Sequence, residues 1–490
     1  MALIDDLRSL NGIRVHEASF TEVGGAAYFT ARRGLDTHVG CAGDGGLAGE
    51  RVGQAAGRPV VLGPLGHGNA TVIRDRLPWT APRLLGLATS IGLGDRLGLA
   101  TPGHIRAVRG TGVACVLAQQ SIREMTRTQR TPEEIIDCAT WGALQEGFRD
   151  GFGADADHLQ RPEDVDATLA AGFTFFTIDP GAHVNDDADG MSLEALGKAF
   201  ETLDFAALDS SADDLKARYL DRRFALSGGG EVAIGAADLL RAAVKYGGAV
   251  AHTAAMYRHL SGKADRQVEV EVSVDETESP TSPGEHYFFA AELKRLGVHW
   301  VSMAPRFVGR FEKGVDYIGS LDEFRQSLAQ HVAVMRTLGP YKISIHSGSD
   351  KFSVYPIVAD LTSGLMHLKT AGTSYLEALR AVAAIDPGLF RQILDFARGR
   401  YGTDRATYHV SAEVSRVPAA SDVADNDLAA LLDDFHAREV LHVTFGSVLT
   451  ADGGSRFRDP LLGALRRDEE AHYAALERHI GRHLAGMARH

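Results

Sequence analysis

Residues 268–277 read VEVEVSVDET, in which valine alternates with polar residues. Successive side chains of a β-strand point to opposite faces, so one face of this strand carries only valine and the other carries Glu269, Glu271 and Ser273. We expect the valines to pack on outer helices and the acids to point into a barrel. The alternative is an edge strand with one face in water, which the pattern alone leaves open.

Runs of this kind recur along the chain, separated by segments with helical periodicity such as 132–144 and 321–338. Alternating strands and helices predict a mostly parallel sheet covered by helices. About eight such units predict a closed (β/α)₈ TIM-type barrel, with a doubly wound open sheet as the alternative. We expect one barrel domain over residues 1–490, with a helical insertion at 192–262. The predicted strands are 59–62, 84–91, 113–118, 173–178, 268–274, 300–304, 342–346, 365–369 and one or both of 408–413 and 441–445.

The chain has 490 residues and a formal net charge of −13, from 51 Lys and Arg against 64 Asp and Glu. Nucleic acids and anionic membranes attract positively charged proteins, so we expect neither as a partner, whereas local cations could still hold an anionic substrate. The three cysteines, Cys41, Cys115 and Cys138, form no CxxC pair, which favours a reducing compartment. With neither a signal peptide nor a long apolar span, we expect a cytoplasmic enzyme, and homo-oligomer formation stays open.

Titratable residues gather at the ends of predicted strands, and in such barrels the chemistry sits at the carboxyl ends of the strands. Two successive predicted strands end in His346 and in His367 with Lys369, and two others end in Asp179 and Glu276. A lone histidine is usually structural, but two imidazoles with two carboxylates predict a site for a divalent metal ion. We expect zinc, with manganese, cobalt or nickel as alternatives. Either Asp275 or Glu271 could replace Glu276.

Several loops after the predicted strands carry groups that could bind an anion. The run HSGSDK at 346–351 offers hydroxyls, backbone N–H groups and the charge of Lys351. The run IGLGDR at 91–96 lacks the GxGxxG spacing of a dinucleotide-binding loop, so we interpret it as a basic stretch instead. The predicted substrate-binding residues are Asp95, Arg96, Ser121, Arg306, Lys313, Ser347, Ser349 and Lys351.

Five long motifs resemble the tagaturonate epimerase family, the hexuronate C4-epimerases of bacterial sugar-acid catabolism. The resemblance runs from about residue 87 to the C-terminus and is weakest at 192–262. It implies a metal-dependent barrel enzyme that interconverts D-fructuronate and D-tagaturonate. The motifs are QQSIREMTRT at 119–128, VDETESPTSPGEH at 274–286, APRFVGRFEKGVDYIG at 304–319, YKISIHSGSDKFSVYP at 341–356 and HLKTAGTSYLEALR at 367–380.

The reaction that this resemblance implies inverts C4, which is not adjacent to the C2 carbonyl, so simple proton abstraction is disfavoured. We expect retro-aldol cleavage of C3–C4 followed by aldol addition on the other face. Glu124 and Asp275 are candidates for the general base, and Lys369 could instead form a Schiff base. The rival hypotheses are a metal-dependent aldolase or ketose isomerase on the same barrel, and a non-catalytic sugar-acid binding protein.

Overall fold

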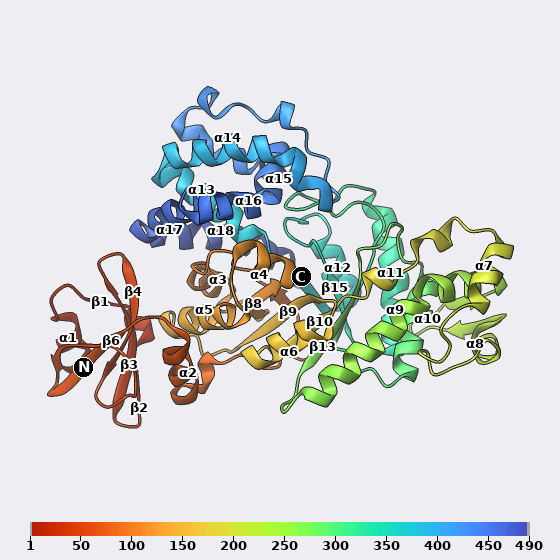
Figure 1. Ribbon diagram of the computed structural model, residues 1–490, viewed down its shortest axis with the longest axis horizontal. Coiled ribbons are helices and arrows are strands. Elements are labelled where there is room, and N and C mark those ends of the chain that lie inside the picture. The colour runs from red at the N-terminus through yellow and green to blue at the C-terminus, as the bar shows by residue number, and fades with distance from the viewer. Residues whose placement is uncertain (1, 488–490) are drawn as a thin grey trace.

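The computed structural model describes residues 2–487, and its centre is a closed barrel of eight parallel strands (Figure 1). The neighbours around the barrel are β10, β13, β14, β15, β16, β7, β8 and β9, and β9 closes it against β10. The predicted TIM-type barrel is therefore confirmed, and the open-sheet alternative is wrong. The strands are β7 (Ser90–Gly92), β8 (Ala114–Ser121), β9 (Phe152–Leu159), β10 (Phe175–Ile178), β13 (Glu269–Val274), β14 (Ser302–Pro305), β15 (Lys342–Ile345) and β16 (Met366–Lys369).

Strand β13 has the orientation that its alternation predicts. Its valines belong to the main hydrophobic core, which lies between the barrel and its outer helices. Glu271 is fully buried and lies 2.6 Å from His346 on the chain after β15 and 2.9 Å from Lys369 on β16. These contacts cross the barrel, so the acidic face is the inner one and the edge-strand alternative is wrong.

Strand β9 is the one barrel strand that we did not predict. Its sequence, FGADADHL, places two acids and a histidine in eight residues, which hides the apolar signal of a buried strand. Phe152, Ala154 and Ala156 nevertheless alternate with Gly153 and two aspartates. The alternation follows the same rule as in β13, because the acids face the barrel interior.

Two of the predicted strands do not form, and a third forms but lies outside the barrel. Segment 408–413 forms no strand, and segment 441–445 spans the junction of helices α15 (Phe435–Val443) and α16 (Phe445–Thr450). Its run of apolar residues packs inside the helical layer, and a short buried run alone does not distinguish a strand from a helix. Segment 59–62 is a strand, but it belongs to a separate antiparallel sheet.

That sheet forms the N-terminal part of the chain, beside the barrel (Figure 1). Helix α1 (Ala2–Arg8) covers one face, and α2 (His67–Arg76) with Trp141 of α5 (Pro132–Gln145) covers the other. Both faces are therefore buried, as the apolar runs of its strands require. The strands are β1 (Arg14–Val15), β2 (Thr21–Val23), β3 (Ala26–Arg33), β4 (Asp36–Ala42), β5 (Glu50–Ala55) and β6 (Arg58–Gly63).

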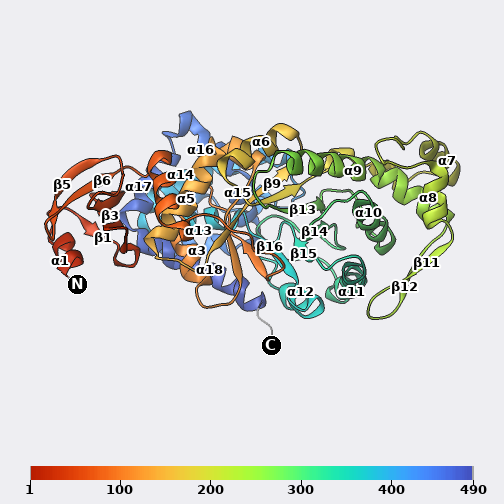
Figure 2. The same cartoon turned by 90° about the horizontal axis from the view of Figure 1, so that it is seen from below.

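The predicted helical insertion lies between β10 and β13, on the side of the barrel away from the N-terminal sheet (Figure 2). It contains α7 (Leu193–Glu201), α8 (Ala212–Tyr219) and the long helix α9 (Ala236–Lys263). A two-stranded hairpin, β11 (Arg222–Ala225) with β12 (Glu231–Ile234), adds a feature that we did not predict.

The other helices either surround the barrel or form a layer over one of its ends (Figure 1). None of the described helices is long and apolar enough to cross a membrane. The outer helices are α3 (Thr101–Val108), α4 (Ile122–Thr128), α5 (Pro132–Gln145), α6 (Pro162–Ala171), α10 (Pro283–Arg295), α11 (Leu321–Leu338) and α12 (Tyr355–Thr362). The C-terminal layer consists of α13 (Thr373–Ile385), α14 (Pro387–Asp404), α15, α16 and α17 (Arg458–Arg467), with its own hydrophobic core. Helix α18 (Glu469–Met487) packs on α3, α12 and α13, and its Ile480, Leu484 and Met487 belong to the main core.

The first and last barrel strands are β7 and β16, so the barrel strands occupy only residues 90–369 of the chain. The prediction of one domain over residues 1–490 stays a prediction. What the structure adds is an antiparallel sheet before the barrel and a helical layer after it. The helical layer matters for function, because it borders the carboxyl ends of the barrel strands.

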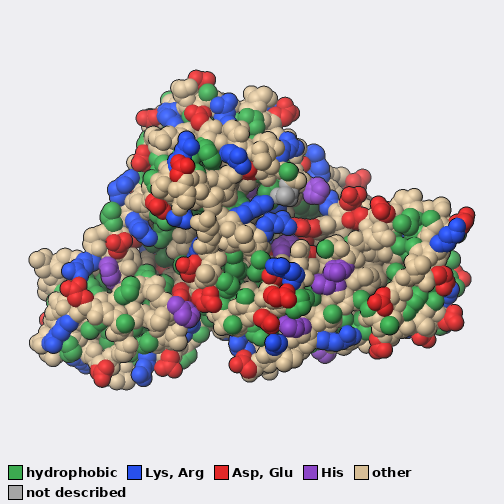
Figure 3. Space-filling model, in the orientation of Figure 1, with side chains coloured by type: hydrophobic (Ala, Val, Ile, Leu, Met, Phe, Trp, Pro, Cys, Tyr) green, Lys and Arg blue, Asp and Glu red, His purple; other side chains and the backbone are tan. Residues whose placement is uncertain are grey.

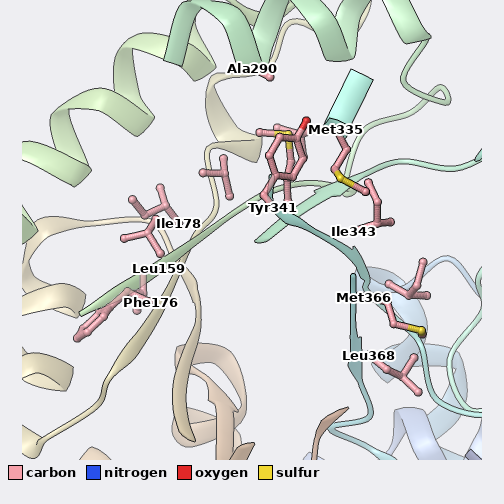
Figure 4. Packing of buried hydrophobic residues seen from close by; sticks show 14 of the residues in the cluster. Leu159, Phe176, Ile178, Ala290, Met335, Tyr341, Ile343, Met366 and Leu368 are labelled. Atoms are coloured by element: carbon pink, nitrogen blue, oxygen red, sulfur yellow. The ribbon is translucent and has the colours of Figure 1, made fainter. Parts of the chain in front are cut away.

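Aromatic and branched side chains fill the space between the strands and the outer helices (Figure 4). Phe176 is fully buried on β10, paired with Val270 on one side and with Ala156 on the other. We expect Phe176→Ala to lower the free energy of unfolding by about 3–5 kcal/mol, because it leaves a cavity in a close-packed core. Denaturant unfolding followed by far-UV circular dichroism measures the change.

The control is Leu193→Ala, at a side chain that is 57% exposed, which should change stability by less than about 0.5 kcal/mol. Equal effects of the two substitutions would contradict the packing that we describe.

Candidate active site

A cleft lies where the C-terminal helical layer meets the carboxyl ends of the barrel strands, and Lys and Arg side chains gather at this junction (Figure 3). Barrel loops form most of its wall. The helical layer contributes His442, and the segment between α14 and α15 contributes Tyr408 and His409. The lining residues are Arg96, Gln119, Ser121, Arg123, Glu124, Asp157, His158, Asp275, Glu276, Pro305, Arg306, Phe307, Gly309, Arg310, Phe311, Glu312, Lys313, Gly314, His346, Ser347, Ser349, Lys369, Ala371, Gly372, Tyr408, His409 and His442.

The floor of the cleft is built around the ammonium group of Lys369. Its Nζ lies 2.8 Å from Asp155, 2.7 Å from Asp157 and 2.9 Å from Glu271, and it donates to the Thr177 hydroxyl at 2.6 Å. Burial alone would lower the pKa of Lys369, but the three carboxylates raise it well above its ordinary value. The amine is therefore held as a cation.

His346 lies between two carboxylates beside this ammonium. Its Nε2 is 2.6 Å from Glu271 and its Nδ1 is 3.2 Å from Asp275. Burial lowers the pKa of His346, whereas Asp275 and Glu271 raise it, and the result is about 9. Burial raises the pKa of Asp275, but the adjacent imidazole outweighs it and holds the pKa below its ordinary value.

His158, at the end of β9, is the second imidazole of the site. The rings of His158 and His346 meet edge to face with centroids 5.1 Å apart. Asp179 lies behind it, where its Oδ2 contacts His158 Nδ1 at 3.1 Å and accepts a hydrogen bond from Gln160 at 2.9 Å. Burial lowers the pKa of His158, but Asp157 and Asp179 together raise it well above its ordinary value.

The potential ligand atoms of Asp157, His158 and His346 lie within 4.8 Å of one another. One carboxylate and two imidazoles form the N/O donor set that zinc and similar divalent ions prefer. The second oxygen of the nearby Glu271 is buried without a hydrogen-bond partner among the described residues, which leaves acceptor capacity at this point. The residues present therefore fit a divalent cation.

This cluster includes only one of the four metal ligands predicted from the sequence. Asp179 lies behind His158, and Glu276 lies near the cleft surface, 3.4 Å from Arg123. His367 is buried in the barrel interior, where its Nδ1 contacts the Ser90 hydroxyl at 2.9 Å. Among the described residues, these four do not converge on one point, because His367 comes too early on β16 to reach the mouth of the barrel.

The predicted base Glu124 is engaged by other side chains of the cleft. Its Oε1 accepts hydrogen bonds from Nε and Nη2 of Arg96 at 2.8 and 2.6 Å. It also forms a capping box with Ser121 at the start of α4, in which Ser121 Oγ accepts from the Glu124 backbone N–H at 3.2 Å.

Two of the predicted substrate-binding residues are turned into the protein instead. The Lys351 ammonium donates to the carbonyls of Glu312, Val315 and Ser349, and burial lowers its pKa to about 7. The carboxylate of Asp95 accepts three backbone N–H bonds from the start of its own loop and helix α3. Neither side chain lines the cleft, because each satisfies backbone groups of a loop.

The remaining predicted substrate-binding residues line the cleft. Lys313 donates to the Ser347 hydroxyl at 2.6 Å, and Ser349 is buried beside them. Arg306 donates to the backbone carbonyl of Asp275 at 3.4 Å. Together with Arg96 and Ser121 they make the cleft rich in groups that bind an anion.

A second group of potential ligands, Asp350 with His479 and His483, lies behind the loop that carries Ser347 and Ser349. Arg438 already occupies it, with its Nη2 2.9 Å from Asp350. His479 also contacts Asp350, and His483 Nε2 accepts the Asp350 backbone N–H at 3.0 Å. This group therefore fastens the loop to helices α15 and α18.

Asp155, Asp157 and His158 were not among the predicted site residues, because strand β9 was not among the predicted strands. The signal was present, since ADADH at 154–158 places acids at every second position and ends in a histidine. His442 was also missed. It stands within a helix of the C-terminal layer, and nothing in its local sequence places it at the barrel mouth.

Comparisons with known proteins give a consistent result. The sequence model of a tagaturonate epimerase family, UxaE, matches residues 16–487. A tagaturonate/fructuronate epimerase of Thermotoga maritima is 40% identical over 476 residues, which are 96% of each protein. The structure of fructuronate-tagaturonate epimerase UxaE from Cohnella laeviribosi with one glycerol is 38% identical, covers 99% of this chain and 98% of its own, and has a TM-score of 0.93. Its native structure has a TM-score of 0.92.

The contact between Asp179 and His158 predicts a measurable pKa change. A negative charge beside an imidazole favours the protonated form, so removing that charge lowers the pKa. We expect Asp179→Asn to lower the pKa of His158 toward its ordinary value, as followed by NMR titration of the ring protons.

The matched control is Asp166→Asn, which removes the carboxylate 2.7 Å from the distant His259. This substitution should leave the pKa of His158 unchanged. A His158 pKa that is the same in the Asp179 variant and the unsubstituted protein would contradict the role of Asp179.

Proposed function

The chain belongs to the tagaturonate epimerase family and is an epimerase of the isomerase class, and we propose that it interconverts D-fructuronate and D-tagaturonate. The observation that carries this proposal is the cleft at the barrel mouth, where acids and imidazoles lie next to cationic residues. A ketose with a terminal carboxylate is complementary to such a cleft.

The reaction must invert C4, and we propose retro-aldol cleavage followed by aldol addition. A base takes the proton from the C4 hydroxyl, C4 becomes an aldehyde, and the electrons of the C3–C4 bond pass to the C1–C3 fragment as an enediolate. The aldehyde fragment then rotates and the bond re-forms on its other face, with the proton returned to the C4 oxygen. No atom is gained or lost, as an epimerisation requires.

Asp157, His158 and His346 would hold a divalent ion, which we propose to be zinc, with manganese, cobalt or nickel as alternatives. When bound, the ion would supply a Lewis acid for the negative charge that develops on substrate oxygens. Asp179 orients His158 from behind, as an outer carboxylate commonly does for a histidine ligand.

Lys369 fits an electrostatic role better than Schiff-base chemistry. A Schiff base needs a neutral amine, whereas three carboxylates hold Lys369 as an ammonium. We propose that this charge keeps Asp155, Asp157 and Glu271 together at the floor of the cleft.

Of the two predicted bases, Asp275 has the better geometry. It is ionised at neutral pH, and it lines the cleft with its Oδ1 3.2 Å from His346 Nδ1. Glu124 has one oxygen bound to Arg96 through two hydrogen bonds, which makes it a counter-ion for that guanidinium. We therefore propose Asp275 as the group that accepts the C4 hydroxyl proton.

Turnover of D-fructuronate, followed by NMR, tests the activity directly. We expect D-tagaturonate as the only product, with no deuterium at C4 when the reaction runs in heavy water, because retro-aldol chemistry does not exchange that hydrogen. Net three-carbon products would mean an aldolase, and an aldose product would mean an isomerase. Binding without turnover would mean a non-catalytic sugar-acid binding protein.

The metal proposal is tested by two histidine substitutions. We expect His346→Ala to lower metal content and kcat/KM together, by at least about 100-fold in activity, since even outer partners of metal ligands cost 10–100-fold. Elemental analysis and the epimerase assay measure the two quantities, with circular dichroism as the check on folding.

His367→Gln is the matched control. Both histidines were predicted as ligands, but His367 lies deeper in the barrel, so its variant should keep bound metal. Full metal content in the His346 variant, or full activity in protein stripped of metal by a chelator, would overturn the proposal.

A further inference from the structure

Arg96 has a donor that no described residue uses. Its Nε and Nη2 bind Glu124, but its Nη1 is buried and has no hydrogen-bond partner among the described residues. The residue is only 5% exposed, it lines the cleft, and its Cζ lies over the Phe445 ring, 3.6 Å from the ring centroid. A buried donor without a partner is costly, so its persistence indicates a ligand that completes it.

Lys313 is a second cation in the same part of the cleft. Its ammonium donates to Ser347, and among the described residues no carboxylate lies within 4.0 Å of it. Ser349, which is buried, adds a hydroxyl beside it. This corner therefore contains positive charge that the protein does not neutralise.

His442 lines the same pocket as these two cations. Burial lowers its pKa first, and the charges of Arg96 and Lys313 lower it further, so the ring stays neutral and can donate one hydrogen bond. Its Nδ1 is buried and also has no partner among the described residues. The His442 ring packs against Gly372, where a larger residue would clash, since a Cβ there would lie 1.8 Å from His442 Nε2.

The cleft therefore contains two groups of residues with different chemistry. We define its cationic end as Arg96, Lys313 and His442. The other end consists of Asp157, His158 and His346, which we propose as metal ligands. Both groups line one continuous cavity.

On the basis of the proposed function, we propose that the cationic end binds the carboxylate of the sugar acid, and that this contact sets the direction of the substrate in the cleft. A carboxylate is the planar acceptor that matches a guanidinium and an ammonium together. With C6 held there, the C2 and C3 oxygens point toward Asp157, His158 and His346, and C4 lies between the two ends.

This assignment also explains how the reaction avoids losing an intermediate. Cleavage of C3–C4 leaves a three-carbon aldehyde that still carries the carboxylate. Arg96 and Lys313 retain that fragment by its charge while its aldehyde group rotates about the chain. A neutral ketose would leave the Arg96 donor unpaired, and sites of this kind reject such analogues by about 10⁴-fold.

The test measures binding of the carboxylate separately from turnover. The probe is D-glycerate, a three-carbon hydroxy acid, and glycerol is its neutral analogue. Binding of each to the purified protein as isolated is followed by NMR, together with kcat and KM for D-fructuronate. The variants are Arg96→Met and Arg96→Lys. Because Arg96→Met leaves Glu124 without a counter-ion, Glu124→Gln and the double variant are measured as well.

We expect Arg96→Met, alone and combined with Glu124→Gln, to weaken glycerate binding and raise KM by about 100-fold, with glycerol binding unchanged. Arg96→Lys should restore part of the loss. Arg106→Met is the matched control, since Arg106 also pairs with glutamates, Glu146 and Glu470, but lies outside the cleft. It should behave like the unsubstituted protein.

The outcomes separate this inference from the proposed function. Unchanged glycerate binding and KM in the Arg96 variants would overturn the inference even if the protein epimerises fructuronate, because the carboxylate would then bind elsewhere, such as at the opposite end. If the Arg96 variants lose glycerate binding but the unsubstituted protein does not turn over fructuronate, the result would support the carboxylate site and overturn the proposed reaction.

Discussion

The ion pairs between Lys369 and the carboxylates of Asp155, Asp157 and Glu271 are the interaction on which the site depends. Three acids buried at one end of a barrel would repel one another and suffer the cost of lost hydration. One ammonium among them offsets this cost and draws β9, β13 and β16 toward a common point. Such pairs add little to net stability compared with apolar packing, so their purpose is to hold charge where the chemistry needs it.

The need to hold these charges together also determines which elements supply the acids and which supply the cations of the cleft. Acids and imidazoles come from the strand ends, where the closed barrel brings them together. Positive charge comes from Lys369 on β16, from Arg123 on α4 and from the loops after β7 and β14, and the C-terminal layer contributes His442 and Tyr408. The helical layer is therefore a part of the site, because without it the cationic end would be open to water, which weakens every charged contact.

Strain in one loop shows that the surroundings hold the site in shape. Ser347 and Asp350 have φ angles of 48° and 65°, in the left-handed region that residues other than glycine rarely adopt. Asp350 is held by Arg438 and the histidines of α18, and the Lys351 ammonium binds three carbonyls around the loop. Such strain persists only where neighbours enforce it, and here it places the Ser347 hydroxyl beside Lys313.

The sequence by itself determined the alternation of strands and helices and the division of β13 into an apolar and an acidic face, because period-two alternation is a local property of a strand. The closure of the barrel, and with it the burial of the acidic face, was decided by the tertiary structure. The sequence also identified several residues of the cleft, including Arg96, Lys313, Ser347, His346 and Lys369, since polar groups after apolar strands are visible in the chain. Only the tertiary structure decided which of these groups meet. His367 stands earlier on β16 than Lys369, so its side chain lies in the barrel interior and not at the mouth. The Lys351 ammonium donates to backbone carbonyls and does not reach the cleft. His158 ends a strand whose alternation is visible in the sequence, and barrel closure brings it to His346. His442 joined the cleft through helix packing against distant loops, which leaves no local pattern.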